Sequence, residues 1–302
     1  MNQTHLFSNF QQTLISILKR MTWCPDILYL RMRYYLENGK KLHLSNPVTF
    51  QEKIQWLKIN RRKPEFTTMV DKYAAKDYVA SKISSEYIIP TLGVWNSFDE
   101  IDFNILPDSF VLKTTHGGGN GGVVICRTKK TFNKDEARKK INASLQECIY
   151  DALREWPYKN VPRRIIAEEL ITDSVKNDLM DYKVFCFNGV PRYVQVIQDR
   201  NTNETIDFYD TEWNHQEFYG LNPVYGTEIK PAVNAIPKPN NLDKMLDIAK
   251  TLSKGTEFLR VDLYNVNGKI YFGELTFFPA SGFGTFTPAA WNIKLGNMIK
   301  IC

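Results

Sequence analysis

A glycine-rich segment in the middle of the chain has the composition of an anion-binding loop. Lys113 lies on a predicted strand, Phe110–Thr114, and five glycines follow at Gly117, Gly118, Gly119, Gly121 and Gly122. Glycine lets backbone N–H groups approach an anion unobstructed, and the lysine supplies positive charge. Gly-Lys-Ser/Thr is absent and a strand follows the loop, so neither the Walker loop nor the dinucleotide fingerprint fits. The alternatives are a hairpin tip without a ligand and, for His116, a structural role.

A second group of polar residues near the C-terminal end could bind a divalent cation. Arg260 and Asp262 lie on one predicted strand, Phe258–Val266, and Glu274 and Thr276 lie on the next. Two carboxylates suit Mg²⁺, which takes oxygen ligands and leaves positions open for phosphate oxygens. An adjacent arginine can stabilise a transferred phosphoryl group. The alternative is an ordinary surface cluster of salt bridges.

The turn between these strands decides whether the four side chains share a face. A two-residue turn at Asn267-Gly268 would place Asp262 opposite Gly273 and send Glu274 to the other side. A three-residue loop with Gly268 left-handed would put all four on one face. The apolar pattern favours the three-residue loop, because the opposite face would then bury Leu259, Val261, Leu263, Tyr271, Leu275 and Phe277.

A third candidate is the apolar strand that ends in Glu168, Glu169 and Leu170. A carboxylate there could bind ribose hydroxyls, and the backbone could bind the edge of an adenine. A strand end that enters solvent is the alternative.

The elements that must position these residues form an α+β pattern. Residues 1–85 are predicted to be helical, with helices from Ile27 to Asn38, from Thr49 through a capping box to Ile59, and from Phe66 to Lys82. Strands are predicted at 110–114, 123–126 and 164–170, with a helix at 133–154 before the last of them. Hairpins are predicted around Asn188-Gly189 and Asn267-Gly268, with a helix at 242–253 between them. Hairpins favour antiparallel sheets over a doubly wound parallel sheet.

Composition sets wider bounds. The net charge is +6, from 39 basic and 33 acidic residues among 302, without a run of five like charges, which suits a small anionic ligand better than nucleic acid. The five cysteines form no C-x-x-C pair, which favours a reducing cytoplasm over a disulfide or zinc framework.

No signal peptide or transmembrane segment is predicted. The N-terminal twenty residues predict an amphipathic helix that docks on the body, with contact to the inner face of a membrane or to a partner protein as the alternative.

The order of these pieces resembles the ATP-grasp superfamily and, within it, the TupA-like ATP-grasp family of bacterial surface-polysaccharide (capsule) biosynthesis. The matching stretches are residues 44–57, 70–79, 88–93, 106–113, 181–189, 260–264 and 272–276, and the resemblance as a whole covers about residues 27–296. The resemblance implies two α+β subdomains with antiparallel sheets that clasp ATP. We expect a helical N-terminal region at 1–105, a small flap subdomain at 106–170 and a large subdomain with the metal site at 171–302.

The resemblance also implies roles for individual residues. Lys72 and Lys113 correspond to phosphate-binding lysines, and the glycines from Gly117 to Gly122, with His116 beside them, to the mobile flap. Glu168, Glu169 and Leu170 correspond to the hinge that holds adenine and ribose, and Lys183 to a further nucleotide contact. Asp262 and Glu274 correspond to Mg²⁺ ligands, and Arg260, with Lys113, to the catalytic cations. The superfamily often has asparagine where this chain has Thr276, and the threonine hydroxyl is a poorer metal ligand than the asparagine side chain.

The implied activity is ATP-dependent carboxylate–amine ligation through an acylphosphate, on a small-molecule or lipid-linked sugar that carries a carboxylate, such as a uronic acid. The acceptor would be an amino acid or another amine. Three alternatives remain: a kinase of the same fold that phosphorylates a sugar hydroxyl, a polysaccharide glycosyltransferase, and a non-catalytic nucleotide-binding module. Metal-dependent glycosyltransferases commonly carry Asp-x-Asp, which this sequence lacks.

Overall fold

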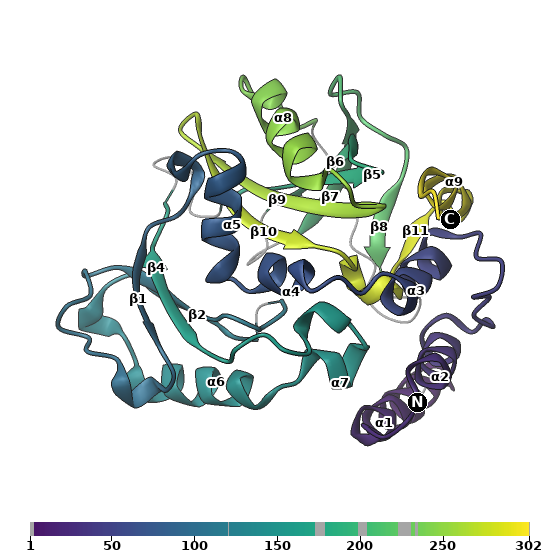
Figure 1. Cartoon of the computed structure of the whole chain (residues 1–302), viewed down its shortest axis with the longest axis horizontal. Coiled ribbons are helices and arrows are strands. Elements are labelled where there is room, and N and C mark those ends of the chain that lie inside the picture. The colour runs from purple at the N-terminus through teal and green to yellow at the C-terminus, as the bar shows by residue number, and fades with distance from the viewer. Residues whose placement is uncertain are drawn as a thin grey trace.

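Two antiparallel sheets lie at the centre of the computed structural model, with helices around them (Figure 1). The structure describes residues 3–119, 121–172, 179–198, 204–222, 231–232 and 235–301. The four-stranded sheet has the order β1-β4-β2-β3 and the five-stranded sheet the order β10-β9-β5-β6-β7. The strands of the four-stranded sheet are β1 (Thr91–Trp95), β2 (Phe110–Thr114), β3 (Val123–Cys126) and β4 (Ile165–Glu169). Those of the five-stranded sheet are β5 (Asp181–Phe187), β6 (Val190–Gln198), β7 (Thr205–Asp210), β9 (Phe258–Val266) and β10 (Lys269–Thr276).

Helices make up most of the remainder. They are α1 (Gln3–Arg20), α2 (Asp26–Asn38), α3 (Phe50–Asn60), α4 (Glu65–Val70), α5 (Ala74–Lys82), α6 (Lys134–Gln146), α7 (Ile149–Leu153), α8 (Leu242–Ser253) and α9 (Ala290–Met298). Two short strands, β8 (Tyr219–Asn222) and β11 (Thr285–Thr287), form a separate pair. All strand pairings among the described residues are antiparallel, which confirms the expected α+β class.

Each central sheet buries one face and leaves charged residues on the other. In the four-stranded sheet, Phe110, Leu112 and Ala167 pack against Ile141 of α6. Lys113 and Glu168 have the opposite parity on β2 and β4, so they lie on the other face. The three-part division of the chain stays a prediction; β1, from before residue 106, joins this sheet.

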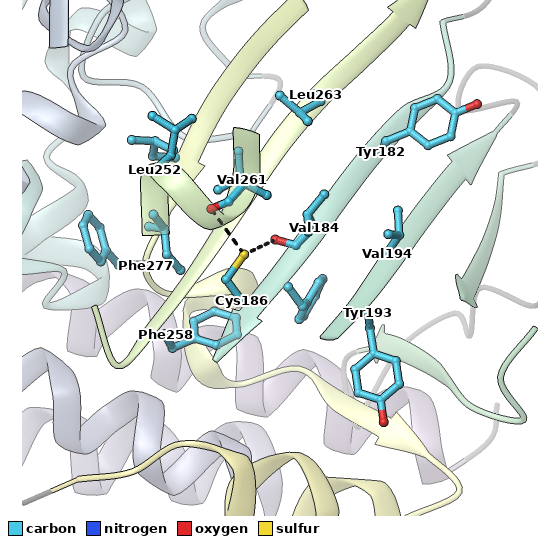
Figure 2. Close-up of a cluster of buried hydrophobic side chains, with 14 of the residues drawn as sticks. Tyr182, Val184, Cys186, Tyr193, Val194, Leu252, Phe258, Val261, Leu263 and Phe277 are labelled. Carbon is cyan, nitrogen blue, oxygen red and sulfur yellow. Dashed lines mark hydrogen bonds between the residues drawn. The ribbon is translucent and has the colours of Figure 1, made fainter. Parts of the chain in front are cut away.

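The five-stranded sheet packs one face against α8. Figure 2 shows Val184, Cys186 and Val261 of this face together with Leu252 of the helix. The Cys186 thiol donates a hydrogen bond to the Ala249 carbonyl at 3.7 Å. On the other face, Phe50 of α3 contacts the ring of Phe258 edge-on at 5.1 Å. Phe185 and Phe187 of β5 are also buried on that face, and the polar residues of the candidate site lie beside them.

The helix predictions are confirmed in part. Helix α2 ends at Gly39 in the left-handed conformation, and Thr49 and Glu52 form the predicted capping box of α3. The single helix predicted from Phe66 to Lys82 is wrong. It is two helices, α4 and α5, because the Asp71 carboxylate accepts bonds from the backbone of Tyr73 and Ala74 and starts a new helix.

The predicted helix at 133–154 is also divided, into α6 and α7, because the backbone becomes extended at Glu147 and Cys148. The N-terminal helix docks as expected, with Ile15 and Leu18 buried. Among the described residues, no helix combines the length and the apolar character that crossing a bilayer requires.

Candidate active site

The β9–β10 hairpin presents Arg260, Asp262, Glu274 and Thr276 on one face, but not for the predicted reason. The turn has two residues, Asn267 and Gly268, and pairs Val266 with Lys269, so the predicted three-residue loop is wrong. A β-bulge between Phe272 and Glu274 then shifts the register by one residue. Glu274 consequently lies opposite Asp262, and Thr276 lies opposite Arg260.

Gly273 is the extra residue of this bulge. A Cβ atom at Gly273 would lie 3.1 Å from the carbonyl oxygen of Asp262, closer than most real Cβ contacts. The bulge also changes which apolar residues are buried. Ile270 and Phe272 are buried, whereas Tyr271, predicted to be buried, lies partly exposed on the other face.

Arg260 connects the polar side chains of this face. Its guanidinium donates to both oxygens of Asp262, at 2.6 and 2.7 Å, to Glu274 at 3.2 Å and to the Thr276 hydroxyl at 3.1 Å. Lys183, the register partner of Asp262 on β5, forms an ion pair with the same carboxylate. Burial by itself would raise the pKa of Asp262, but Arg260 and Lys183 outweigh it and hold that pKa below its ordinary value.

The facing part of the four-stranded sheet carries a second charge cluster. The Glu168 carboxylate, 6% exposed, lies between the ammonium groups of Lys76, at 2.6 Å, and Lys113, at 2.5 Å. Although burial opposes ionisation, the two lysines hold the pKa of Glu168 below its ordinary value. Sequence reasoning did not select Lys76. The available signal was a second lysine, four residues after Lys72.

The end of β4 and the β9–β10 turn face each other across a pocket. Its volume is about 320 Å³, and its walls include Glu169 and Leu170 on one side and Asn267, Lys269 and Tyr271 on the other. Two of the three predicted hinge residues thus line a pocket between the sheets. Glu168, the third, points into the lysine pair instead.

Lys72 lies where the two charged faces meet. Its side chain donates a hydrogen bond to the Gly117 carbonyl, and its backbone N–H donates to Thr115 at 2.9 Å. Burial lowers the pKa of Lys72. The nearby Glu274 carboxylate raises this pKa, and the Lys113 ammonium lowers it further. Lys72 is therefore bonded to the glycine loop and within electrostatic range of an acid from the other sheet.

Two glycines of the loop are required by close packing. The hydroxyls of Thr114 and Ser144 form a hydrogen bond at 2.8 Å, and Gly117 and Gly122 lie directly against this pair. A Cβ atom on either glycine would lie 2.4 or 2.2 Å from the Thr114 oxygen. Gly119 has a left-handed φ of 60° with no neighbour near its Cβ position, and Asn120 lies outside the described residues.

The other loop residues are less tightly enclosed. Gly118 has only a side-chain tip of α7 close to its Cβ position, and Gly121 has a carboxylate oxygen at 4.0 Å. His116 is buried against the end of α6, with Nε2 3.2 Å from the Ser144 carbonyl. Burial, with the nearby Arg163, lowers the pKa of His116 and favours the neutral ring.

A further buried cluster adjoins the hairpin, and sequence reasoning missed it. Lys58 of α3 is fully buried and donates to the Leu153 carbonyl at 2.9 Å and to the carbonyl and hydroxyl of Ser281 at 2.8 and 2.7 Å. Ala280 and Ser281 have left-handed φ values of 46° and 51° in the segment after β10. Burial raises the pKa of nearby Glu155, and the Glu274 carboxylate adds to this effect. Aromatic residues of the C-terminal segment that follows β10, including Phe277 and Phe286, are buried and pack in the core.

Comparison with known proteins gives a family match. A family model described as TupA-like ATPgrasp matches residues 52–300. The search of curated proteins gave no match.

Among solved structures, the chain is similar to the D-alanine–D-alanine ligase from Bacillus anthracis complexed with ATP, at 15% identity and a TM-score of 0.43, over 77% of this chain and 63% of that chain. For the same ligase from Helicobacter pylori the identity is 14%, the TM-score 0.40, and the coverage 77% and 61%. For the ATP-grasp ligase PsnB complexed with minimal precursor, Mg and ADP, the identity is 12% and the TM-score 0.38, over 75% of this chain and 57% of that chain. The chain spans less than two thirds of the length of each of these three.

Proposed function

Because the chain belongs to the TupA-like ATP-grasp family, we propose that it is an ATP-dependent carboxylate–amine ligase of surface-polysaccharide biosynthesis. The observation that carries this proposal is the meeting of two charged faces, from separate sheets, at Lys72. One face contributes Lys113 and the glycine loop, and the other contributes Arg260 with two carboxylates. Such a site can bind a triphosphate and stabilise charge on its terminal phosphoryl group.

In this proposal the nucleotide lies between the sheets. The pocket lined by Glu169 and Leu170 takes adenine and ribose, with the hinge backbone available to the base. Lys72, Lys113 and the loop from Gly117 to Gly122 bind the phosphates. Lys183, now bonded to Asp262, is the further nucleotide contact.

The residues present fit a Mg²⁺ ion that is bound together with nucleotide. Asp262 and Glu274 are cross-strand partners, and the Thr276 hydroxyl lies beside them. The described residues contain no cluster of three or more histidine, cysteine or acidic side chains that could hold a metal, so phosphate oxygens would complete the coordination, as is usual for Mg²⁺. When bound, Mg²⁺ would neutralise phosphate charge. Arg260 and Lys183 would exchange their bonds to Asp262 for bonds to phosphate.

The proposed reaction has two steps. A carboxylate oxygen of the sugar attacks the γ-phosphorus and ADP leaves, giving an acylphosphate. The amine then attacks the acyl carbon, loses a proton and expels inorganic phosphate, giving the amide. Arg260 and Lys113 stabilise charge in the first step, and the glycine loop excludes water from the acylphosphate.

The decisive experiment follows an oxygen atom. The chain is incubated with ATP, uronic acids carrying ¹⁸O in the carboxylate, and a panel of amino acids, and products are weighed by mass spectrometry. The proposal predicts an amide, ADP, and one ¹⁸O atom in the released phosphate only when an amine is present. Phosphate retained on the sugar would instead indicate a kinase, and turnover of sugar nucleotides without ATP a glycosyltransferase.

The variant Asp262→Asn tests the site itself. It removes the charge that faces Arg260 and Lys183, so we expect turnover to fall about a hundredfold or more. Asp243→Asn, at an exposed acid at the start of α8, is the matched control and should turn over normally. Full activity in Asp262→Asn would contradict the catalytic assignment.

A further inference from the structure

The solvent-facing side of α2 is unusually apolar. Trp23, just before the helix, is 76% exposed, and Ile27, Leu28 and Tyr35 are 45%, 51% and 59% exposed. We call these four side chains the N-terminal apolar stripe. With Ile17, five of the eleven exposed large hydrophobic side chains of the described chain lie between residues 17 and 35. Single exposed apolar residues are ordinary, but a concentration of this kind marks an interaction surface.

Helix geometry places the stripe on one face. At about 100° per residue, positions 27, 28, 31 and 35 fall within an arc of about 100°. Of the residues that α2 buries, Tyr29, Leu30 and Arg33 point to the other side, whereas Tyr34 and Asn38 lie near the Ile27 edge of this arc. The stripe is therefore largely separate from the face that packs on the body, and the same arc of the helix carries one exposed cation, Arg31.

The charges around the stripe have one sign. The exposed charged side chains of residues 11–41 are all basic: Lys19, Arg20, Arg31, Lys40 and Lys41. The two acids of this segment are already paired, Asp26 with Arg62 at 2.6 Å and Glu37 with Arg33 at 2.7 Å. The surface thus combines exposed aliphatic and aromatic groups with five cations that form no ion pair within the part of the chain that the structure describes.

The stripe is held firmly to the body of the protein. Arg154, 1% exposed, donates from Nη2 to the carbonyls of Met21 and Cys24, at 3.0 and 3.3 Å, in the turn that carries Trp23. Its Nε lies 3.2 Å from Asp26. Figure 1 shows α1 and α2 together at one end of the molecule, beside α3 and α7 and outside both central sheets. A large partner could cover this end without occupying the space between the sheets.

We propose that the N-terminal apolar stripe docks the protein on the surface of an anionic lipid bilayer. An interfacial helix combines an apolar face, which enters the headgroup region, with lysine and arginine that attract anionic lipid. Tryptophan and tyrosine suit the boundary between acyl chains and water. A flat bilayer can engage Trp23 and α2 together with the flanking cations, whereas a protein partner would need matching acids at five separate positions. This inference is independent of the proposed ligase activity.

The test uses the full chain and vesicles in a flotation assay. We expect binding to vesicles of phosphatidylglycerol with phosphatidylcholine, weaker binding in high salt, and little binding to phosphatidylcholine alone. The double variant Ile27→Ser with Leu28→Ser should bind at least tenfold more weakly. Arg31→Glu should lose about fivefold or more, because each cation near the surface contributes about 1 kcal/mol.

Ile105→Ser is the matched control, since Ile105 is 67% exposed and lies outside the N-terminal segment. It should bind vesicles as the unchanged chain does, and all variants should show unchanged thermal unfolding because the altered side chains are exposed. Absence of binding to anionic vesicles, or unchanged binding in the double variant, would overturn the proposal. So would a concentration-dependent dimer that the double variant abolishes, because the stripe would then belong to a second copy of the chain.

Discussion

At the scale of single residues, Glu168 shows how one buried carboxylate can neutralise two lysines. Its carboxylate is buried between Lys76 and Lys113, and the two lysines lower its pKa from 4.5. A carboxyl group whose pKa is lower in the folded state contributes stability above its unfolded pKa. That contribution is lost as the pH falls through the folded value.

We therefore predict that Glu168→Gln destabilises the protein by about 3 kcal/mol at neutral pH, because the ammonium groups of buried Lys76 and partly buried Lys113 lose their counter-charge. The difference from the unchanged chain should shrink as the pH falls from about 4.5, where Glu168 becomes protonated in the unfolded chain, through its lower pKa in the folded protein. Urea unfolding between pH 3 and 7 measures this. Glu169→Gln, at the exposed neighbouring position, is the control and should change stability little at any pH.

The sequence identified some site residues and missed others for a physical reason. Arg260, Asp262 and Glu274 were predictable from the sequence, because alternation along a hairpin determines which side chains share a face. Lys76, Lys58 and Glu155 were not, because their importance comes from burial against segments distant in the chain. A lysine or glutamate in a helical sequence ordinarily indicates a solvated surface.

At the scale of elements, local signals predicted turns and caps but not irregularities. The Asn-Gly turns, the capping box of α3 and the glycine that ends α2 follow from residue type alone, and all are confirmed. The bulge at Gly273 carries no comparable signal, and we inferred the correct face from the wrong turn length. The strands β1, β7, β8 and β11 were not predicted. Two of them have only three or four residues, too few for a pattern to be distinguished from chance.

The bulge yields a prediction about one glycine. Gly273→Ala places a methyl group against the Asp262 carbonyl, so we expect a loss of stability of about 1–3 kcal/mol together with weakened Mg²⁺·ATP binding. The reason for the second effect is that relief of the clash must displace Asp262 or Glu274. Calorimetric titration with Mg²⁺·ATP, paired with thermal unfolding, measures both effects.

Gly268→Ala provides the matched control within the same hairpin. Gly268 has a φ of 79° and open space at its Cβ position, so alanine there adds backbone strain of about 1 kcal/mol without a clash. Stability should fall while nucleotide binding is retained. Equal binding losses in both variants would mean that hairpin stability, and not the bulge, governs the site.

At the scale of the whole molecule, segments distant in sequence converge on Lys72. Lys72 lies in the break between α4 and α5, where Thr115 and Gly117 accept its hydrogen bonds. The Glu274 carboxylate of the other sheet opposes the effect of burial on the pKa of Lys72. The family match confirms the expected ATP-grasp architecture. Which acids and cations would compensate each other across the sheets could not be predicted, because no local pattern specifies how two separate sheets face each other.

This convergence predicts opposite effects of one substitution on the free and the nucleotide-bound protein. Because burial disfavours the charged form of Lys72, we expect Lys72→Met to leave the unliganded protein equally stable or more stable. A ligand at a hundred times its Kd stabilises a protein by about 2.7 kcal/mol, and each tenfold loss of affinity removes about 1.4 kcal/mol of this. Thermal unfolding with and without Mg²⁺·ATP should therefore show a large shift for the unchanged chain and for the control Lys140→Met, at an exposed lysine of α6, but little for Lys72→Met. An undiminished shift in Lys72→Met would mean that nucleotide binds elsewhere, whereas a marked loss of unliganded stability would make Lys72 a structural residue.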